Sequence, residues 1–349
     1  MNMETTYFVI VCLMFTTYVV LDGFDFGAGI LHLFVAKTDE ERRTVLASIG
    51  PFWDGNEVWL VAGGGILFFA FPRAYSASFS GFYLPFMMVL WLLILRGLSI
   101  AFRSMEESPL WRTAWDGVFF LSSALMAIVL GAALGNVVRG VPLDHEGYFS
   151  GPLFTNFLPG ANPGVLDWYT VLVGLFSFVL LAMHGAIFLR MKTDGPVHDR
   201  SAALAQGLWY AIIGFGLLTS VATVQVQPQL YAALLSRPLA WVLTVGNVVA
   251  LVGIALGLKG KTAVSPFLAS CALIVLSLAT VATGMYPVML RSTLGAKNDL
   301  TVTSSASGAL GLQAGLIFWL FAMALAFGYV ALLFRSSAGK IQPSEGNGH

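Results

Sequence analysis

The most unusual acidic residues lie between positions 20 and 60, inside or beside long apolar segments. Asp22 and Asp25 close the first segment within Asp-Gly-Phe-Asp-Phe-Gly-Ala-Gly, and Asp54 and Glu57 open the next within Trp-Asp-Gly-Asn-Glu. A carboxylate at membrane depth costs free energy, which makes each of the four a candidate for a functional role. Residues three apart share a helix face. Asp22 and Asp25 therefore form a pair that could take up and release protons near neutral pH.

The surrounding residues fit proton transfer and structural support alike. Asp54 lies at a helix start, where the helix dipole stabilises an acid, but this effect explains Glu57 less well. Arg96, about one and a half turns inside the third apolar segment, can reach the membrane surface or pair with Asp25 or the second motif. Asp22 and Asp25 can instead hydrogen-bond to neighbouring backbone or to an arginine and only hold the bundle together. Supporting candidates at this end are Trp53, Asn56, Trp59 and Asp116, the two tryptophans as interface anchors or as a platform for a ring-shaped ligand.

Composition indicates a polytopic membrane protein. Only 10% of the 349 residues are charged, 57% are apolar and the mean hydropathy is +0.81, whereas roughly a quarter of a soluble protein is charged. The 18 basic and 18 acidic residues cancel, so net charge gives no attraction to nucleic acid. Cys12 and Cys271 lie in apolar segments, which favours packing over a disulfide or a metal site.

Apolar windows of about 20 residues predict an all-α protein with nine transmembrane helices. Loops after the odd-numbered predicted helices hold twelve Lys and Arg, and loops after the even-numbered ones hold five. Because basic loops stay in the cytoplasm, we predict that the N-terminus lies outside and the C-terminus lies in the cytoplasm. Both acidic motifs then lie toward the cytoplasmic side. We predict one transmembrane domain over 1–336, with helices 1–4 at about 6–138 and helices 5–9 at about 166–335, and a disordered cytoplasmic tail over 337–349. The spans are 6–36, 51–71, 78–102, 113–138, 166–190, 202–224, 239–258, 264–285 and 308–335.

Candidate haem ligands are sparse. A haem needs axial His, Met, Cys or Tyr side chains inside the helices, and only His32 and His184 of the five histidines fall near apolar segments. An intramembrane histidine is more often a hydrogen-bonded structural residue. We therefore expect this chain to bind no haem and no metal by itself.

Motifs along nearly the whole chain resemble those of one family. They are Asp22-Gly-Phe-Asp25-x-Gly-x-Gly29, Glu41-Arg42-Arg43, Pro51-x-Trp53-Asp54-Gly55-Asn56-x-Val58-Trp59-Leu60, Trp115-Asp116 and Tyr286-Pro287. In these motifs the chain resembles subunit II of the cytochrome bd quinol oxidases, including the cyanide-insensitive branch. It departs from some members at Phe52, where they have His, and at Glu57, where they have Gln.

The resemblance implies a bacterial cytoplasmic (inner) membrane complex that oxidises quinol and reduces dioxygen to water. Two b-type haems and haem d would be held by subunit I, the partner in a heterodimer, and subunit II would bind none. The implied fold has two four-helix bundles and one peripheral helix, and a proton-uptake route is ascribed to acids matching Asp25 and Asp54. Membrane lipids and quinone are the implied surroundings, and a small accessory subunit is left open.

Two other functions remain open on the residues alone. Intramembrane acids and glycines would also suit a proton-coupled secondary transporter. Such a transporter should have polar, interrupted segments in both halves, yet predicted helices 5–9 hold few ionisable residues. In the third interpretation the chain is a purely structural subunit, whose acids only stabilise the bundle.

Overall fold

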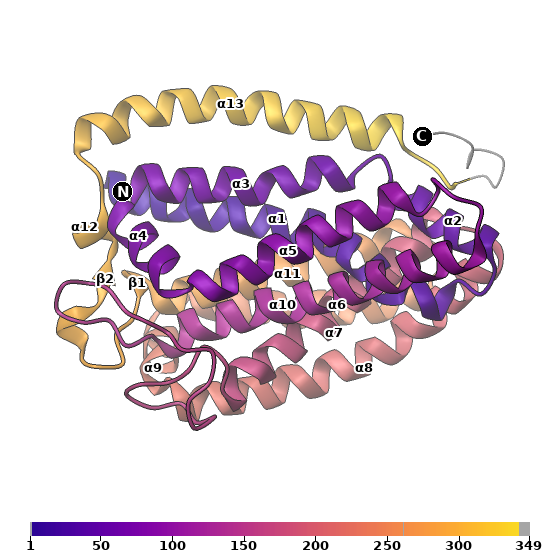
Figure 1. The fold of residues 1–349 in the computed structure, drawn as a ribbon. Coiled ribbons are helices and arrows are strands. Elements are labelled where there is room, and N and C mark those ends of the chain that lie inside the picture. Colours follow the sequence, from indigo (N-terminus) through magenta and orange to yellow (C-terminus); the bar gives the residue numbers. More distant parts are fainter. Residues whose placement is uncertain (1, 261, 342–349) are drawn as a thin grey trace.

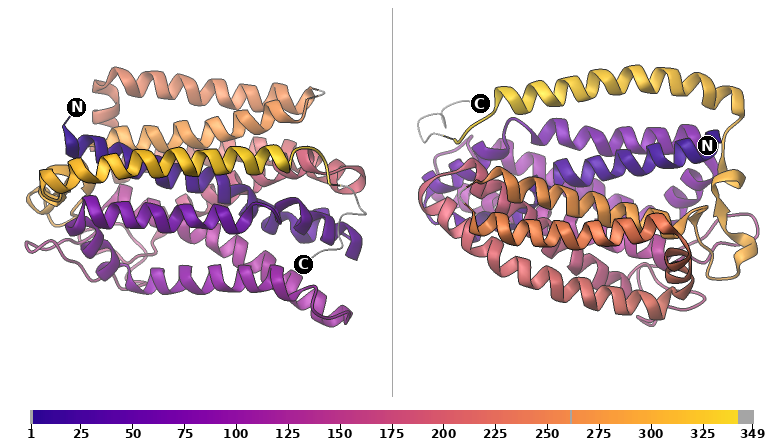
Figure 2. Two further views of the ribbon diagram at one scale, coloured as in Figure 1. Left: turned by 90° about the horizontal axis from the view of Figure 1, so that it is seen from above. Right: turned by 180° about the vertical axis from the view of Figure 1, so that it is seen from behind.

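The computed structural model describes residues 2–260 and 262–341, mostly as α-helices whose axes lie roughly along one common direction (Figures 1 and 2). Eight of the described helices are long and apolar enough to cross a membrane. The chain is therefore a multi-pass membrane protein, and the predicted all-α class is confirmed. The helices are α1 Met3–Val35, α2 Asp39–Ile49, α3 Trp53–Ala70, α4 Pro72–Gly81, α5 Tyr83–Phe102, α6 Pro109–Arg139, α7 Trp168–Lys192, α8 Gly195–Val226, α9 Pro228–Ser236, α10 Pro238–Lys259, α11 Val264–Met285, α12 Val302–Ser305 and α13 Ala309–Ser336; β1 Val288–Leu290 pairs antiparallel with β2 Leu300–Thr301, and a 3₁₀ turn spans Ala296–Asn298.

Many of these helices begin at capping residues or at a proline, which are typical of helix starts. Asn2 accepts a hydrogen bond from the backbone N–H of Thr5 at the start of α1, and Thr38 and Glu41 form a capping box on α2. Asp167 caps α7 with its side chain. Proline occupies the first turn of α4, α6, α8, α9 and α10, where its missing N–H would have had no helical partner.

The second half of α1 forms the centre of the bundle. Every residue from Asp22 to His32 is buried, with α6, α7 and α3 packed around the helix. A Cβ atom on Gly27 would lie 2.1 Å from the carbonyl oxygen of Leu181 and 2.6 Å from the Cα of Gly185. The backbones of α1 and α7 thus approach so closely that only glycine fits, which fixes the acidic part of α1 against α7.

The predicted spans mostly coincide with single helices. The predicted span 78–102 overlaps two helices, α4 and α5, which meet at Phe82. The predicted span 51–71 is α3, which has 18 residues and begins with the polar acidic motif, and it is not among the eight spanning helices. The count of nine, the two four-helix bundles and the orientation in the membrane stay predictions.

Different elements form the two ends of the bundle. At one end lie α2, the start of α6 and the end of α7, and at the other lie the 140–167 loop, α9 and the β1–β2 pair (Figure 1). Beyond α13, the amide of Ile341 donates to the carbonyl of Lys192 at 2.8 Å, and Lys340 pairs with Asp194. The rest of the predicted tail, 342–349, lies outside the described residues.

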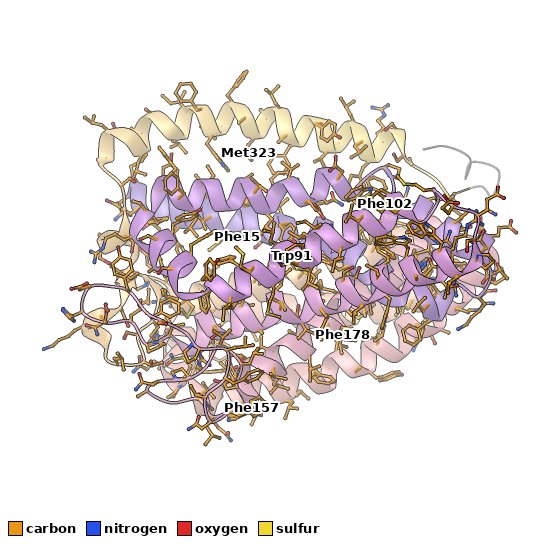
Figure 3. The ribbon with its side chains drawn as sticks, in the orientation of Figure 1. Phe15, Trp91, Phe102, Phe157, Phe178 and Met323 are labelled. Carbon is orange, nitrogen blue, oxygen red and sulfur yellow. The ribbon has the colours of Figure 1, made fainter. Side chains whose placement is uncertain are left out.

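Helix α13 is the most exposed of the long helices. Leu312 is the one buried residue along α13, all of which the structure describes. Met323 packs partly buried against the core, and other side chains of α13 project away from the bundle (Figure 3). This helix leaves a long apolar surface for lipid or another protein.

Candidate functional site

Arg96 joins two of the four candidate acids across three helices. Its Nη1 donates to Oδ1 of Asp22 on α1 at 2.6 Å, and its Nη2 donates to Oε1 of Glu57 on α3 at 2.5 Å. The guanidinium carbon lies 4.2 Å above the ring centroid of Phe26. Asp22 and Arg96 are fully buried, whereas 26% of the Glu57 side chain is exposed. This arrangement balances the Arg96 charge inside the bundle and ties α5 to α1 and α3.

Asp25 has a different environment, although it lies one turn from Asp22. Its Oδ2 accepts a hydrogen bond of 2.7 Å from the Asn56 amide on α3, which also donates to the carbonyl of Leu21 at 3.2 Å. Its other oxygen, Oδ1, is buried and has no hydrogen-bond partner among the described residues. Asp25 is 1% exposed and forms no ion pair within the described part of the chain. A carboxyl group placed in this way can hold a proton without breaking an ion pair.

Asp54 lies at the surface, in the first turn of α3. The described residues give it no hydrogen bond and no ion pair. Of the two tryptophans, Trp53 is half-buried beside Gly97 of α5, and Trp59 is 6% exposed, with its ring centroid 5.6 Å from that of Phe327 on α13. The second motif therefore runs from an exposed acid at its start to a buried aromatic ring.

Asp116 is the centre of a second polar cluster. It is fully buried in α6 and accepts from Nε2 of His32 at 2.6 Å, from Nη1 of Arg42 at 2.7 Å and from Nε of Arg103 at 2.6 Å. Arg103 also donates to Asp39 at 2.7 Å. The cluster joins α1 and α2 to the C-terminal end of α5 and to α6.

Asp39 lies outside the membrane-spanning helices, at the first position of α2. Burial alone would raise its pKa, but the hydrogen bond from Arg103 and the charges of Arg103, Arg112 and Arg43 outweigh this and lower the pKa of Asp39 below its usual value. The carboxylate is therefore charged at neutral pH and fixes α2 against this arginine cluster.

The structure thus brings Asp22, Asp25, Glu57, Asn56 and Arg96 together, and places Asp54 and Asp116 apart from them. The sequence left an arginine open as a partner for Asp22, but it named Arg96 only as a partner for Asp25, Asp54 or Glu57, so the Asp22–Arg96 pair was not specified. It also missed Arg103 as a hydrogen-bond donor to Asp116. A cluster of arginines around Asp116 could have been expected, since Glu41-Arg42-Arg43 and Trp115-Asp116 were both predicted at the same end.

Comparison with known proteins decides the family. A family model described as cytochrome bd terminal oxidase subunit II matches residues 3–337. The chain belongs to this family. The resemblance inferred from the motifs is confirmed.

Curated relatives of this subunit II family extend the match. The Escherichia coli cytochrome bd-I ubiquinol oxidase subunit 2 is 40% identical over 189 residues, which are 54% of this chain and 48% of the relative. The chain thus spans about half the length of that relative. Cytochrome bd ubiquinol oxidase subunit 2 of Bacillus subtilis is 30% identical over 319 residues, or 89% of each chain. The bd oxidase structure from Geobacillus thermodenitrificans shares the fold, with a TM-score of 0.77, 19% identity and coverage of 97% and 99%.

The two histidines near the apolar segments differ in how far the protein engages their ring nitrogens. His184 uses both ring nitrogens, Nδ1 with Ser270 at 2.8 Å and Nε2 with the carbonyl of Val20 at 3.0 Å, and its ring stacks on Phe267 at 5.2 Å. His32 uses Nε2 with Asp116, and its buried Nδ1 has no hydrogen-bond partner among the described residues. An axial position would require His184 to give up one of these bonds. Within the described residues no cluster of three His, Cys, Asp or Glu side chains could hold a metal ion.

Proposed function

We propose that this chain is the haem-free subunit II of a cytochrome bd-type terminal oxidase in a bacterial cytoplasmic membrane. The complex would couple quinol oxidation to the reduction of dioxygen to water. The two b-type haems and haem d would be held by subunit I and would supply electron transfer and oxygen chemistry. The match over residues 3–337 supports the assignment, and so does the Bacillus subtilis relative named as subunit 2 of a ubiquinol oxidase.

Within that complex, we infer that the chain conducts protons from the cytoplasm. The observation that carries this inference is Asp25, which is buried, accepts a hydrogen bond from an amide and forms no ion pair among the described residues. Asp54 is exposed at the start of the same helix as Asn56, which suits an entry group. Asp22 and Glu57 are both held by Arg96, which suits fixed charges better than carriers, because moving a proton onto either would break an ion pair.

The test is the substitution Asp25→Asn in the purified complex. Asparagine keeps the size and the bond to Asn56 in reach, but it cannot carry a proton. We expect the reduced-minus-oxidised haem spectrum to be unchanged, and oxygen consumption and proton uptake to fall on the order of 100-fold, as for loss of a positioned proton-transfer group. Asp199→Asn removes a carboxylate whose side chain is 80% exposed and should leave turnover unchanged.

Full turnover of the Asp25→Asn complex would refute the proton path and leave a structural subunit. That second function has its own support in the buried Arg96 pairs. It predicts that Asp22→Asn lowers stability without altering turnover in the molecules that assemble. Purification of the chain alone as a stable protein with substrate-driven proton flux would refute the oxidase assignment in favour of a transporter.

A further inference from the structure

We propose that the end of the bundle formed by the 140–167 loop, α9 and the β1–β2 pair binds a phospholipid. Its phosphate would lie in a polar cavity beside Arg291, and one acyl chain would follow an apolar groove between α7 and α8. This site is separate from the acidic cluster and does not depend on the oxidase assignment.

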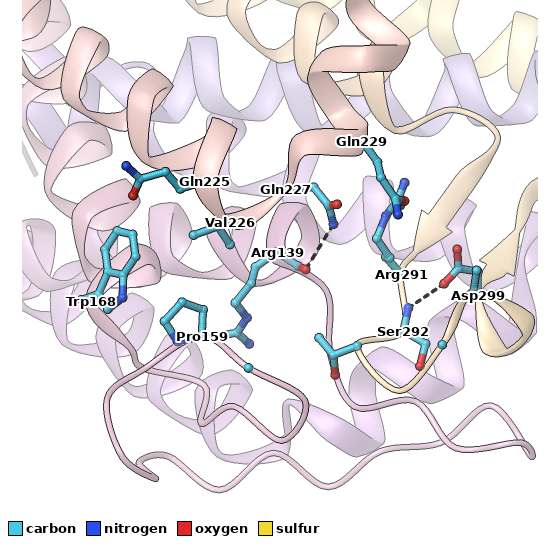
Figure 4. A pocket seen from close by; sticks show the side chains of 14 residues that line it. Arg139, Pro159, Trp168, Gln225, Val226, Gln227, Gln229, Arg291, Ser292 and Asp299 are labelled. Carbon is cyan, nitrogen blue, oxygen red and sulfur yellow. Dashed lines mark hydrogen bonds between the residues drawn. The ribbon is translucent and has the colours of Figure 1, made fainter.

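The polar cavity has the size and the lining of a ligand site. Its volume is about 470 Å³, within the range of small-molecule pockets. Two arginines and three glutamines face it, together with hydroxyl groups of the β1–β2 connection (Figure 4). The lining residues that matter most are Arg139, Arg291, Gln225, Gln229, Ser292 and Asp299.

Only one of the two arginines is fully engaged by the protein. Arg139 forms an ion pair with Asp167 and donates to Asn136 at 2.7 Å and to the carbonyls of Gly140 and Gly164 at 3.1 Å each. Arg291 donates through Nη1 to the neutral side chain of Gln229, and it forms no ion pair among the described residues.

The nearby carboxylate does not neutralise Arg291. Asp299 lines the same cavity, but its Oδ1 accepts from the backbone N–H of Ser292 at 2.7 Å, and no ion pair joins it to Arg291 among the described residues. A guanidinium that is not paired with a carboxylate keeps N–H donors available for a bound anion. The cavity therefore offers a charge-assisted hydrogen bond to an anion, and phosphate oxygens suit it well.

The apolar groove adjoins this cavity directly. Its volume is about 460 Å³, and Trp168 and Gln225 line both spaces. On α8 the groove is lined by Leu218 and Val221, which are 54% and 59% exposed, so it is open to the surroundings of the bundle. On α7 it runs from Trp168 to Leu175, a length of about 10 Å at 1.5 Å per residue.

These two features together select a phospholipid. A tryptophan at the border between the polar and the apolar space is typical of the membrane–water interface, and the groove leads from there along the apolar faces of two membrane helices. Free phosphate would leave the groove uncovered. An isoprenoid quinone would fill the groove but carries no anionic group for Arg291.

The test is native mass spectrometry of the full chain, purified with the subunits that accompany it and stripped of lipid with detergent. Three probes are added back: phosphatidylglycerol, diacylglycerol, which lacks the phosphate, and inorganic phosphate. Arg291→Gln removes the cation, and Lys297→Gln removes an exposed cation of the same connection. Val221→Trp blocks the groove, and Val224→Trp adds the same ring three residues further along α8, at a position that is 47% exposed and lines neither space.

We expect phosphatidylglycerol to bind the unchanged chain more tightly than diacylglycerol. Arg291→Gln should weaken the binding of phosphatidylglycerol about 10- to 100-fold, the effect of losing a charge-assisted hydrogen bond, and should leave the binding of diacylglycerol unchanged. Val221→Trp should weaken the binding of both lipids, and the two control variants should bind both lipids as the unchanged chain does. The proposal is overturned if inorganic phosphate binds as well as the lipid, if the unstripped protein retains a quinone at this site instead, or if test and control variants behave alike.

Discussion

The Arg96 cluster allows the role of a buried charge to be tested quantitatively. The substitution Arg96→Met keeps a long apolar stem beside Phe26 but removes the cation. Asp22 would then be a fully buried carboxylate without its 2.6 Å partner, and Glu57 would lose a 2.5 Å bond while keeping some exposure to solvent. The damage should therefore come mainly from Asp22.

The magnitude follows from the burial of the pair. Removing one partner of a buried ion pair leaves an uncompensated charge and costs about 3–5 kcal/mol. Replacing Asp22 by Asn in the same chain removes that charge, so the double variant should be more stable than Arg96→Met alone. In a double-mutant cycle the two changes should couple by about 1–3 kcal/mol.

The assay is equilibrium unfolding in a mixed-detergent titration at fixed lipid content, measured for the unchanged chain, both single variants and the double variant. Arg112→Met is the matched control, because Arg112 is 27% exposed and pairs with Asp39, which is 38% exposed. Loss of such a surface pair should cost about 0–1 kcal/mol. The reasoning is refuted if Arg96→Met costs no more than Arg112→Met, or if the effects of the two cluster substitutions simply add.

Three further predictions concern other parts of the chain. The hydrogen bond from Arg200 holds the pKa of Glu41 below its usual value. The Glu41 carboxylate should therefore stabilise the fold relative to a Glu41→Gln variant, fully above about pH 4.3 and no longer once the pH falls through the lowered pKa. Unfolding titrations of both chains at several pH values measure this difference. Gly27→Ala should cost at least about 1–3 kcal/mol of stability through overpacking, whereas Gly64→Ala, with no atom within 4 Å of the new Cβ, should be neutral or stabilising; equal losses would contradict the close approach. His184→Gln should leave the reduced-minus-oxidised haem spectrum of the complex unchanged, and a lost haem band would show that this histidine is a ligand.

The membrane helices could be predicted closely from the sequence, because their apolar runs are long. The predicted spans 6–36, 166–190 and 308–335 correspond to α1 at Met3–Val35, α7 at Trp168–Lys192 and α13 at Ala309–Ser336. Elements shorter than a 20-residue window were not predicted, among them α2, α9, α12 and the β1–β2 pair. Their positions depend on caps and tertiary contacts that hydropathy does not record.

The candidate site could be predicted only in part. The residue types marked the acidic motifs, since carboxylates in apolar segments stand out. The pairing of Arg96 with Asp22 links residues 74 apart in the chain, and the bond between Asn56 and Asp25 links residues 31 apart. Such pairs depend on which faces of α1, α3 and α5 meet, and helical periodicity within one segment carries no information about that.

The environments of Asp22 and Asp25 explain why two acids on one helix face need not share a role. Arg96 of α5 reaches Asp22 and Asn56 of α3 reaches Asp25, so the first acid receives a guanidinium and the second an amide. An arginine fixes the charge of its partner, whereas an amide donor leaves the carboxyl free to change protonation at smaller cost. One helix can thus supply a fixed anion that holds α5 in place and, one turn away, a group suited to accept protons. If this division is correct, exchanging the two environments matters more than exchanging the acids: Asn56→Arg should abolish proton uptake with Asp25 still present, by giving it the kind of partner that Asp22 has.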